Sequence, residues 1–108
     1  YNKISPRKVD VHMKIIISNE AMAWFKEEME TTSGEYVRFY ARYGGSSPLH
    51  EGFSLGVTKE EPMDLFVERI EENIHFYIED RDVWYFDGHD LHVNVDSKLQ
   101  ELTYSYKK

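Results

Sequence analysis

Residues 42–56 have the sequence RYGGSSPLHEGFSLG, and this stretch decides the fold that we expect. A run of small and turn-forming residues begins at Gly44-Gly45 and ends at Pro48. Glycine adopts positive backbone φ angles without steric cost and proline fixes its own φ, so the run predicts a loop. Apolar and polar residues alternate on both sides of this loop, which is typical of half-buried strands.

The strand predicted before the loop, over residues 35–43, has two different faces. Successive side chains of a strand point to opposite faces of the sheet. The odd-numbered positions from Val37 to Tyr43 are apolar or aromatic, and they predict the core face. The even-numbered positions from Tyr36 to Arg42 alternate tyrosine and arginine, and they predict the outer face.

The rest of the chain adds one helix near its start and several strands. The β-branched run 14–17 predicts a strand, and Ser18 or Asn19 is a suitable N-cap for a helix over residues 20–31. Gly34 then suits a left-handed turn. Further strands are predicted at residues 53–57, 65–70, 74–78, 91–95 and 99–106, and a short helix capped by Asp80 at residues 80–86. This order predicts an α+β fold with the early helix packed on a largely antiparallel sheet or flattened barrel.

Several of these segments resemble a known family. They are the opening residues 15–21, residues 37–39 with the following Gly44-Gly45, residues 52–56, and residues 74–78 through 88–91. Together they resemble HesB-like domains, the IscA-type or A-type iron–sulfur carriers. The resemblance implies mixed and antiparallel β-sheets that form a flattened barrel, with one N-terminal helix and one short second helix.

The chain departs from that family at the cluster ligands. Members hold iron or a cluster through one cysteine after the glycine pair and a Cys-Gly-Cys near the C-terminus. By position the first ligand falls at Ser46, and only Lys107-Lys108 follow Tyr106. The chain contains no cysteine, and cluster ligation requires thiolates, so we expect no cofactor and no iron–sulfur cluster. The resemblance then implies a non-catalytic binding or adaptor module.

The start of the chain differs in composition from the rest. Residues 1–12 are polar and aperiodic, and His12-Met13 resembles the junction that a cloning site leaves before a start codon. We therefore expect residues 1–12 to be an expression tag or vector-derived leader. Residues 13–108 are then expected to form a single HesB-like domain.

Composition narrows the class of partner. The formal net charge is −7, from 13 basic and 20 acidic residues, which argues against nucleic acid because such binding needs a cationic surface. No run of 18 apolar residues is present, so no membrane partner is expected. The lack of cysteines and of an apolar leader favours a cytoplasmic location. We expect an unknown protein or a small anionic ligand as the partner, and a monomer or weak homodimer.

The tyrosine and arginine face of residues 35–43 and the adjoining loop form the candidate binding site. Guanidinium and phenol groups suit an anionic or aromatic partner, although they can equally pair with the abundant acids and cover the sheet. The loop amides can form an anion nest or a plain tight connection. The candidate ligand- or partner-binding residues are Arg38, Tyr40, Arg42, Gly44, Gly45, Ser46, Ser47 and His50.

Two alternative functions use other residues. A divalent metal could bind His89, His92 and Asp90. On a strand, however, the two histidines point to opposite faces, and the alternative is that they are ordinary exposed side chains. A small hydrolase could use Ser46 or Ser54 with His50, because residues 52–56 match G-x-S-x-G. That motif needs a strand-to-helix turn, which the alternation here does not predict, so we expect no catalytic residues and no enzyme.

The aromatic run at residues 84–86 is a further alternative. Trp84, Tyr85 and Phe86 are predicted to belong to the core. The other interpretation is that one of these rings stays exposed for a partner.

Overall fold

The computed structural model describes residues 13–108, so the leader expected at residues 1–12 lies outside the described residues. The elements of the described part are β1 (Ile15–Ile17), α2 (Asn19–Glu28), β2 (Tyr36–Ser46), β3 (Glu51–Lys59), β4 (Leu65–Glu71), β5 (Ile74–Glu79), η1 (Asp80–Phe86), β6 (Asp90–Asp96) and β7 (Glu101–Lys107). No helix among residues 13–108 is both long enough and apolar enough to span a bilayer.

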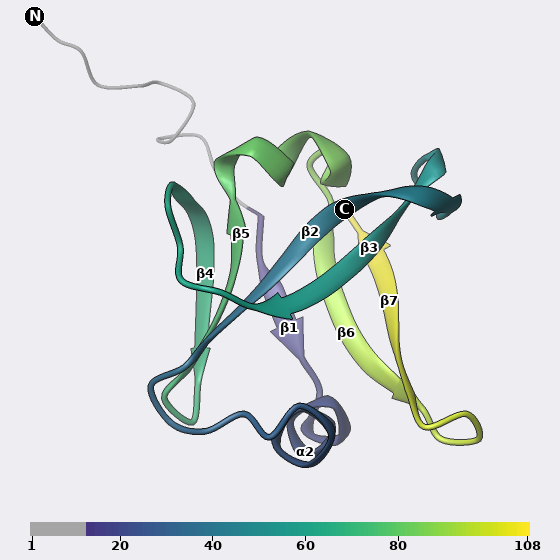
Figure 1. Ribbon diagram of the computed structural model, residues 1–108. Coiled ribbons are helices and arrows are strands. Elements are labelled where there is room, and N and C mark those ends of the chain that lie inside the picture. Colours follow the sequence, from purple (N-terminus) through teal and green to yellow (C-terminus); the bar gives the residue numbers. More distant parts are fainter. Residues whose placement is uncertain (1–12) are drawn as a thin grey trace, which may run out of the picture.

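The strands form two sheets (Figure 1). One has the order β3-β2-β5-β4 and the other has the order β1-β6-β7. The β2–β5 and β1–β6 pairs are parallel and the other pairs are antiparallel, so both sheets are mixed. The predicted α+β class is confirmed. The flattened barrel is wrong, because no ladder among residues 13–108 joins one sheet to the other.

The core lies between the two sheets. Phe39 and Phe76 come from the four-stranded sheet, Leu91 and Val93 from the three-stranded sheet and Phe25 from α2, and all five are buried. Figure 1 shows α2 at one end of the molecule and η1 at the opposite end. The ring centroids of Phe25 and Phe76 are 5.0 Å apart. Each such ring removes about 150–250 Å² from water, so these contacts are a major source of stability.

Helix α2 begins where the sequence predicts it. The Ser18 side chain accepts a hydrogen bond of 3.0 Å from the Ala21 N–H, as an N-cap does. The helix ends at Glu28, earlier than predicted, and Glu30 adopts a left-handed φ of 51°, which the helix cannot continue through. Gly34 makes the predicted left-handed turn, with φ of 92°.

The second helix, η1, is a short 3₁₀ helix at the predicted position. The predicted cap at Asp80 is wrong, because Asp80 is the first residue of η1 and Glu79 precedes it. Glu79 makes no capping hydrogen bond, since its carboxylate accepts hydrogen bonds from the N–H groups of Met63 and Asp64. Asp87, with φ of 48°, ends the helix.

Candidate partner-binding surface

The glycine-rich loop is shorter than predicted, because β2 continues through it. Gly44 and Gly45 have φ of 118° and 66°, as their residue type allows, and belong to β2. The pairing of β2 with β3 shifts register between Tyr43 and Ser46. The glycine pair therefore forms a bulge at the end of the β2–β3 hairpin, where Ser46 pairs with Glu51.

The turn of the hairpin is built on Ser47. Its Oγ accepts hydrogen bonds from the N–H groups of Leu49, at 3.3 Å, and His50, at 3.2 Å. Its own N–H donates to the His50 carbonyl at 3.0 Å. These three amides are occupied within the turn, so an anion nest cannot use them.

His50 attaches this turn to η1. Its Nε2 lies 3.0 Å from the carbonyl oxygen of Tyr85, a distance at which the imidazole N–H donates a hydrogen bond. The His50 ring also lies 5.3 Å, centroid to centroid, from the rings of Trp84 and Tyr85. The hairpin and the helix therefore present a common surface although they are far apart in sequence.

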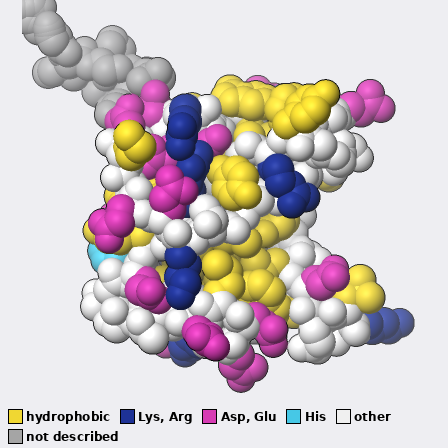
Figure 2. Space-filling model, in the orientation of Figure 1, with side chains coloured by type: hydrophobic (Ala, Val, Ile, Leu, Met, Phe, Trp, Pro, Cys, Tyr) yellow, Lys and Arg dark blue, Asp and Glu magenta, His cyan; other side chains and the backbone are white. Residues whose placement is uncertain are grey.

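Aromatic side chains occupy that common surface, which we call the hairpin–η1 surface: Tyr43, His50, Phe53 and Trp84. The Tyr43 residue is 85% exposed and Trp84 is 48% exposed. Phe53 lies between them, with its ring centroid 5.6 Å from Tyr43 and 5.2 Å from Trp84, both edge to face. Figure 2 shows hydrophobic side chains gathered along the top of the molecule, near η1 and the adjoining end of the hairpin.

Two predictions about burial need correction at this surface. The alternation predicts Tyr43 on the core face, but it is exposed because the end of the β2–β3 hairpin projects from the body of the molecule (Figure 1). Of the aromatic run in η1, Tyr85 and Phe86 are buried as predicted. Trp84 is not, which agrees with the alternative that one ring stays exposed.

Arg42 and Tyr40 lie on the outer face of β2. Arg42 is exposed, and its Nε and Nη2 donate to the Ser54 Oγ at 3.3 and 3.2 Å. The Tyr40 ring covers Gly56, its partner on β3, so closely that a Cβ at Gly56 would lie 2.5 Å from the Tyr40 Cζ. Arg42 is therefore accessible to a partner, whereas Tyr40 fills the space above a glycine.

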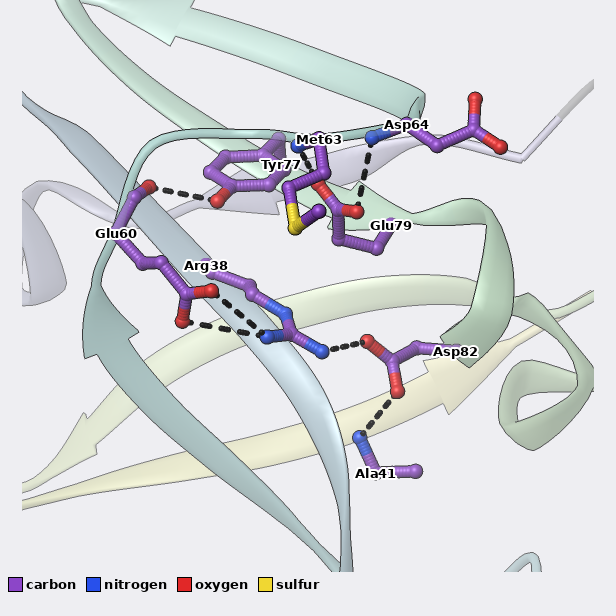
Figure 3. Close-up of polar contacts among 8 residues, drawn as sticks. All are labelled: Arg38, Ala41, Glu60, Met63, Asp64, Tyr77, Glu79 and Asp82. Carbon is purple, nitrogen blue, oxygen red and sulfur yellow. Dashed lines mark hydrogen bonds and ion pairs between the residues drawn. The ribbon is translucent and has the colours of Figure 1, made fainter.

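Arg38, the third residue of this face, belongs to a buried ion pair (Figure 3). Its Nη2 lies 2.7 Å from the Asp82 Oδ2, and the two side chains are 9% and 8% exposed. Its Nη1 lies 3.3 and 3.4 Å from the two carboxylate oxygens of Glu60. Burial opposes the charge of Arg38, but Asp82 and Glu60 outweigh it and raise the arginine pKa above its usual value. The structure thus places Arg38 away from any open binding face.

Residues 60–64, which we call the covering segment, lie beside this ion pair and are fixed to β5 by hydrogen bonds. The Tyr77 hydroxyl donates to the Glu60 carbonyl at 2.6 Å. The Glu79 carboxylate accepts from the Met63 N–H at 2.8 Å and the Asp64 N–H at 3.0 Å (Figure 3). Burial, with smaller effects of the Glu79 and Glu60 carboxylates, raises the pKa of Tyr77 to about 12. The segment therefore covers part of the outer face of the four-stranded sheet.

The alternative metal ligands are not brought together. The Nδ1 of His89 lies 2.9 Å from the Phe86 carbonyl oxygen and 3.2 Å from that of Asp87. The Asp90 Oδ1 accepts a hydrogen bond of 2.8 Å from the Lys14 N–H. Among residues 13–108, no group of three or more histidine, aspartate or glutamate side chains is arranged to hold a metal ion.

The alternative hydrolase residues are not assembled either. The Ser54 Oγ accepts from Arg42, and the His50 ring faces the Tyr85 carbonyl. No hydrogen bond in the described part of the chain joins His50 to Ser46 or Ser54. The G-x-S-x-G match lies within β3, so the serine is on a strand and not at a strand-to-helix turn.

A shallow pocket of about 240 Å³ lies at the other end of the β2–β3 pair. The Thr32 N–H donates to the Glu35 Oε1 at 2.8 Å and, with Lys59, lowers the pKa of Glu35. Acids outnumber bases in the lining, so the pocket does not suit the anionic ligand that the sequence predicted. The lining residues are Gly34, Glu35, Tyr36, Lys59, Glu60 and Glu61.

Comparison with known proteins gives relatives among bacterial proteins. No family model matches the chain, and no solved structure gives a significant match. A pyruvate dehydrogenase inhibitor of Bacillus subtilis (strain 168) is 43% identical over 95 residues, which cover 88% of this chain and all of that protein. The chain belongs to the family of this protein. Uncharacterized family members from Staphylococcus saprophyticus and Staphylococcus aureus are 38% and 36% identical over 98 residues, with the same coverage. The family similarity thus includes both sheets.

Proposed function

We propose that this chain is a non-catalytic regulator that binds pyruvate dehydrogenase and inhibits it. The observation that carries the proposal is the 43% identity, over the whole length of the relative, to a protein named pyruvate dehydrogenase inhibitor. Relatives this similar share a fold, and a shared partner is the simplest account of the similarity. The proposal replaces the unspecified partner expected from the sequence with a protein, and it keeps the expected cytoplasmic location.

The hairpin–η1 surface has the chemistry that a protein partner requires. Tyrosine and tryptophan are among the residues that contribute most to protein–protein affinity, and this surface offers Tyr43 and Trp84. The contacts of Trp84 with His50 and Phe53 restrict its ring before binding. A restricted ring loses little conformational entropy when it is buried, which favours affinity.

Binding alone can account for inhibition. A chain that covers the enzyme's active-site entrance, or the contact between two of its subunits, lowers the rate without chemistry of its own. Inhibition of this kind saturates with the inhibitor concentration and is reversed by dilution. Both behaviours separate it from covalent modification of the enzyme.

Titration of the pyruvate dehydrogenase complex of Bacillus subtilis tests the proposal. The chain should lower the rate of pyruvate consumption, and Trp84→Ala or Tyr43→Ala should raise the half-inhibitory concentration by about tenfold or more, as hot-spot substitutions do. Met63→Ala is the matched control, because Met63 is 83% exposed and lies in the covering segment. The proposal fails if the parent chain does not inhibit, or if all three variants inhibit equally.

We further propose that the fold descends from a HesB-like scaffold that has lost its cysteine ligands. The glycine pair with positive φ, followed by Ser46 at the end of β2, supports this descent. Anaerobic reconstitution with iron and sulfide, followed by visible absorbance, tests the loss of the cluster. We expect no cluster absorbance to remain after desalting, and a stable coloured holoprotein would contradict the proposal.

A further inference from the structure

The two sheets have four edge strands, and these edges are not alike. They are β3 and β4 in one sheet and β1 and β7 in the other. An edge strand exposes unpaired backbone N–H and C=O groups, which proteins usually protect by shortness, bulges or charge. β1 has only three residues, and both β3 and β4 have a register shift in their pairing. Three of the four edges are therefore interrupted or short.

Strand β7 lacks these protections. Its seven residues, Glu101–Lys107, pair with β6 in an unbroken register from Asp96↔Glu101 to Asp90↔Lys107. It contains neither proline nor glycine. Half-buried and exposed residues alternate strictly along it, with Leu102, Tyr104 and Tyr106 toward the core. The free side of β7 is thus a regular edge onto which another strand can pair.

We propose that this edge pairs with β7 of a second copy of the chain, antiparallel and about a two-fold axis through Tyr104. In that register Glu101 of each copy lies opposite Lys107 of the other, and Thr103 lies opposite Ser105. Opposite charges directly across an antiparallel pair stabilise it, and the two-fold axis produces this contact twice. The dimer has one continuous six-stranded sheet of order β1-β6-β7-β7-β6-β1.

The charges select this register over its competitors. A parallel pairing in register places Glu101 opposite Glu101 and Lys107 opposite Lys107, and like charges there are destabilising. An antiparallel pairing shifted by two residues leaves both charges opposite uncharged side chains. Glu101 and Lys107 are exposed, and neither forms an ion pair with any other residue of the described chain. Both are therefore available for a second copy.

The inference goes beyond the proposed function and is independent of it. The β7 edge belongs to the three-stranded sheet, whereas the hairpin–η1 surface is formed by β2, β3 and η1. A seven-residue strand pair buries a small area, so the dimer is expected to be weak, with a dissociation constant between about 10 µM and about 1 mM.

Sedimentation velocity over a wide concentration range tests the dimer with the untagged full chain. Glu101→Lys or Lys107→Glu alone turns both attractive contacts into repulsive ones, so each should raise the dissociation constant by about tenfold or more. An equimolar mixture of the two variants should dimerise like the parent, because each repelled pair becomes an attractive pair in the heterodimer. Glu27→Lys and Lys14→Glu make the same charge changes at exposed positions away from β7 and should leave the constant unchanged.

Each result decides the proposal. A parent chain that remains monomeric up to about 1 mM overturns it, since such an affinity is too weak for a specific pair. A dimer that survives both single substitutions, or a mixture that stays monomeric, also overturns it, because the contact then lies elsewhere. Amide hydrogen exchange gives a second measurement: amides of β7 should exchange more slowly as the parent concentration rises, and those of β4 should not.

Discussion

Arg38 and Arg42 lie on the same face of β2, four residues apart, yet their surroundings are opposite. Arg38 is 9% exposed in its side chain and pairs with Asp82 and Glu60. Arg42 is exposed, and its guanidinium donates hydrogen bonds to the hydroxyl of Ser54. The local sequence around the two arginines is nearly the same. The difference comes from Glu60 of the covering segment and Asp82 of η1, which form ion pairs with Arg38 and none with Arg42.

This comparison separates structural residues from binding residues along one strand. Where the covering segment lies over β2, charge is used to hold the fold together. Where the hairpin projects, aromatic rings and one arginine remain available to a partner. The predictions below test whether each side chain belongs to the end of the strand to which we assign it.

The largest effect is expected from Arg38→Met. The substitution leaves the Asp82 carboxylate buried without its cation, and breaking a buried pair in this way lowers the free energy of unfolding by about 3 kcal/mol. Arg42→Met removes an exposed charge and should cost less than about 0.5 kcal/mol. Urea denaturation of both variants measures the difference. Equal losses would show that the covering segment does not separate the two arginines.

Gly56→Ala should have the next largest effect. The new Cβ would lie 2.5 Å from the Tyr40 Cζ, and the strain of displacing the ring lowers the free energy of unfolding by about 2 kcal/mol. In a Tyr40→Ala background the ring is absent and the same substitution should cost less than about 0.5 kcal/mol. A double-mutant cycle by urea denaturation measures this coupling. If Gly56→Ala lowers the free energy of unfolding equally in both backgrounds, the Tyr40 ring is free to move away from Gly56.

The pH dependence of stability should identify the covered tyrosine. In the unfolded chain tyrosine ionises near pH 10, whereas the folded protein holds the Tyr77 proton until about pH 12. Between these values the unfolded chain has released a proton that the folded chain retains, so the free energy of unfolding falls as pH rises. Tyr77→Phe should reduce this fall. It should not abolish it, because burial also raises the pKa of Tyr104 to about 12.

The same substitution has an effect at neutral pH. Tyr77→Phe removes the hydrogen bond to the Glu60 carbonyl and should cost about 1 kcal/mol at pH 7. Tyr43→Phe, at an exposed ring, is the control, and it should keep the stability at pH 7. Denaturation at a series of pH values gives this stability and the slope above pH 10. Identical slopes for Tyr77→Phe and the parent would contradict the assignment.

An effect as small as that of Tyr77→Phe at pH 7 is expected at the hairpin turn. Ser47→Ala removes the oxygen that accepts from two backbone amides and should cost about 1 kcal/mol. Ser46→Ala, at the neighbouring exposed serine, should cost less than about 0.5 kcal/mol. Thermal unfolding followed by circular dichroism compares the pair. If Ser46→Ala is the more damaging, the turn is not built as described.

Local patterns were sufficient for most elements of the fold. The N-cap at Ser18, the strand at residues 74–78 and the short helix at residues 80–86 each depend on residues close in sequence, and the structure has all three elements. The prediction that the strands close into a flattened barrel was wrong. Closure depends on how far two edge strands approach each other, and no local pattern encodes that distance.

The candidate site was predicted less well, for the same reason. The sequence placed Arg38 and Arg42 together, because nothing near them signals that residues 60–64 fold back over one of the two. It placed Tyr43 in the core, because alternation gives the face of a strand but not where the core ends. Glu79 offered a possible signal, because it is a carboxylate at the end of a buried strand and its side chain does not cap the helix that follows. Such a carboxylate needs hydrogen-bond donors from another segment of the chain.

Hydroxyl-radical footprinting of the chain, alone and bound to the pyruvate dehydrogenase complex, tests the central claim most directly. Tyr43, Trp84 and Met63 are all exposed and all oxidisable, and they lie on the two contrasted parts of the molecule. We predict that the complex protects Tyr43 and Trp84 and leaves the oxidation of Met63 unchanged. Protection of Met63, with Tyr43 and Trp84 still oxidised, would place the binding site on the covering segment and contradict the account.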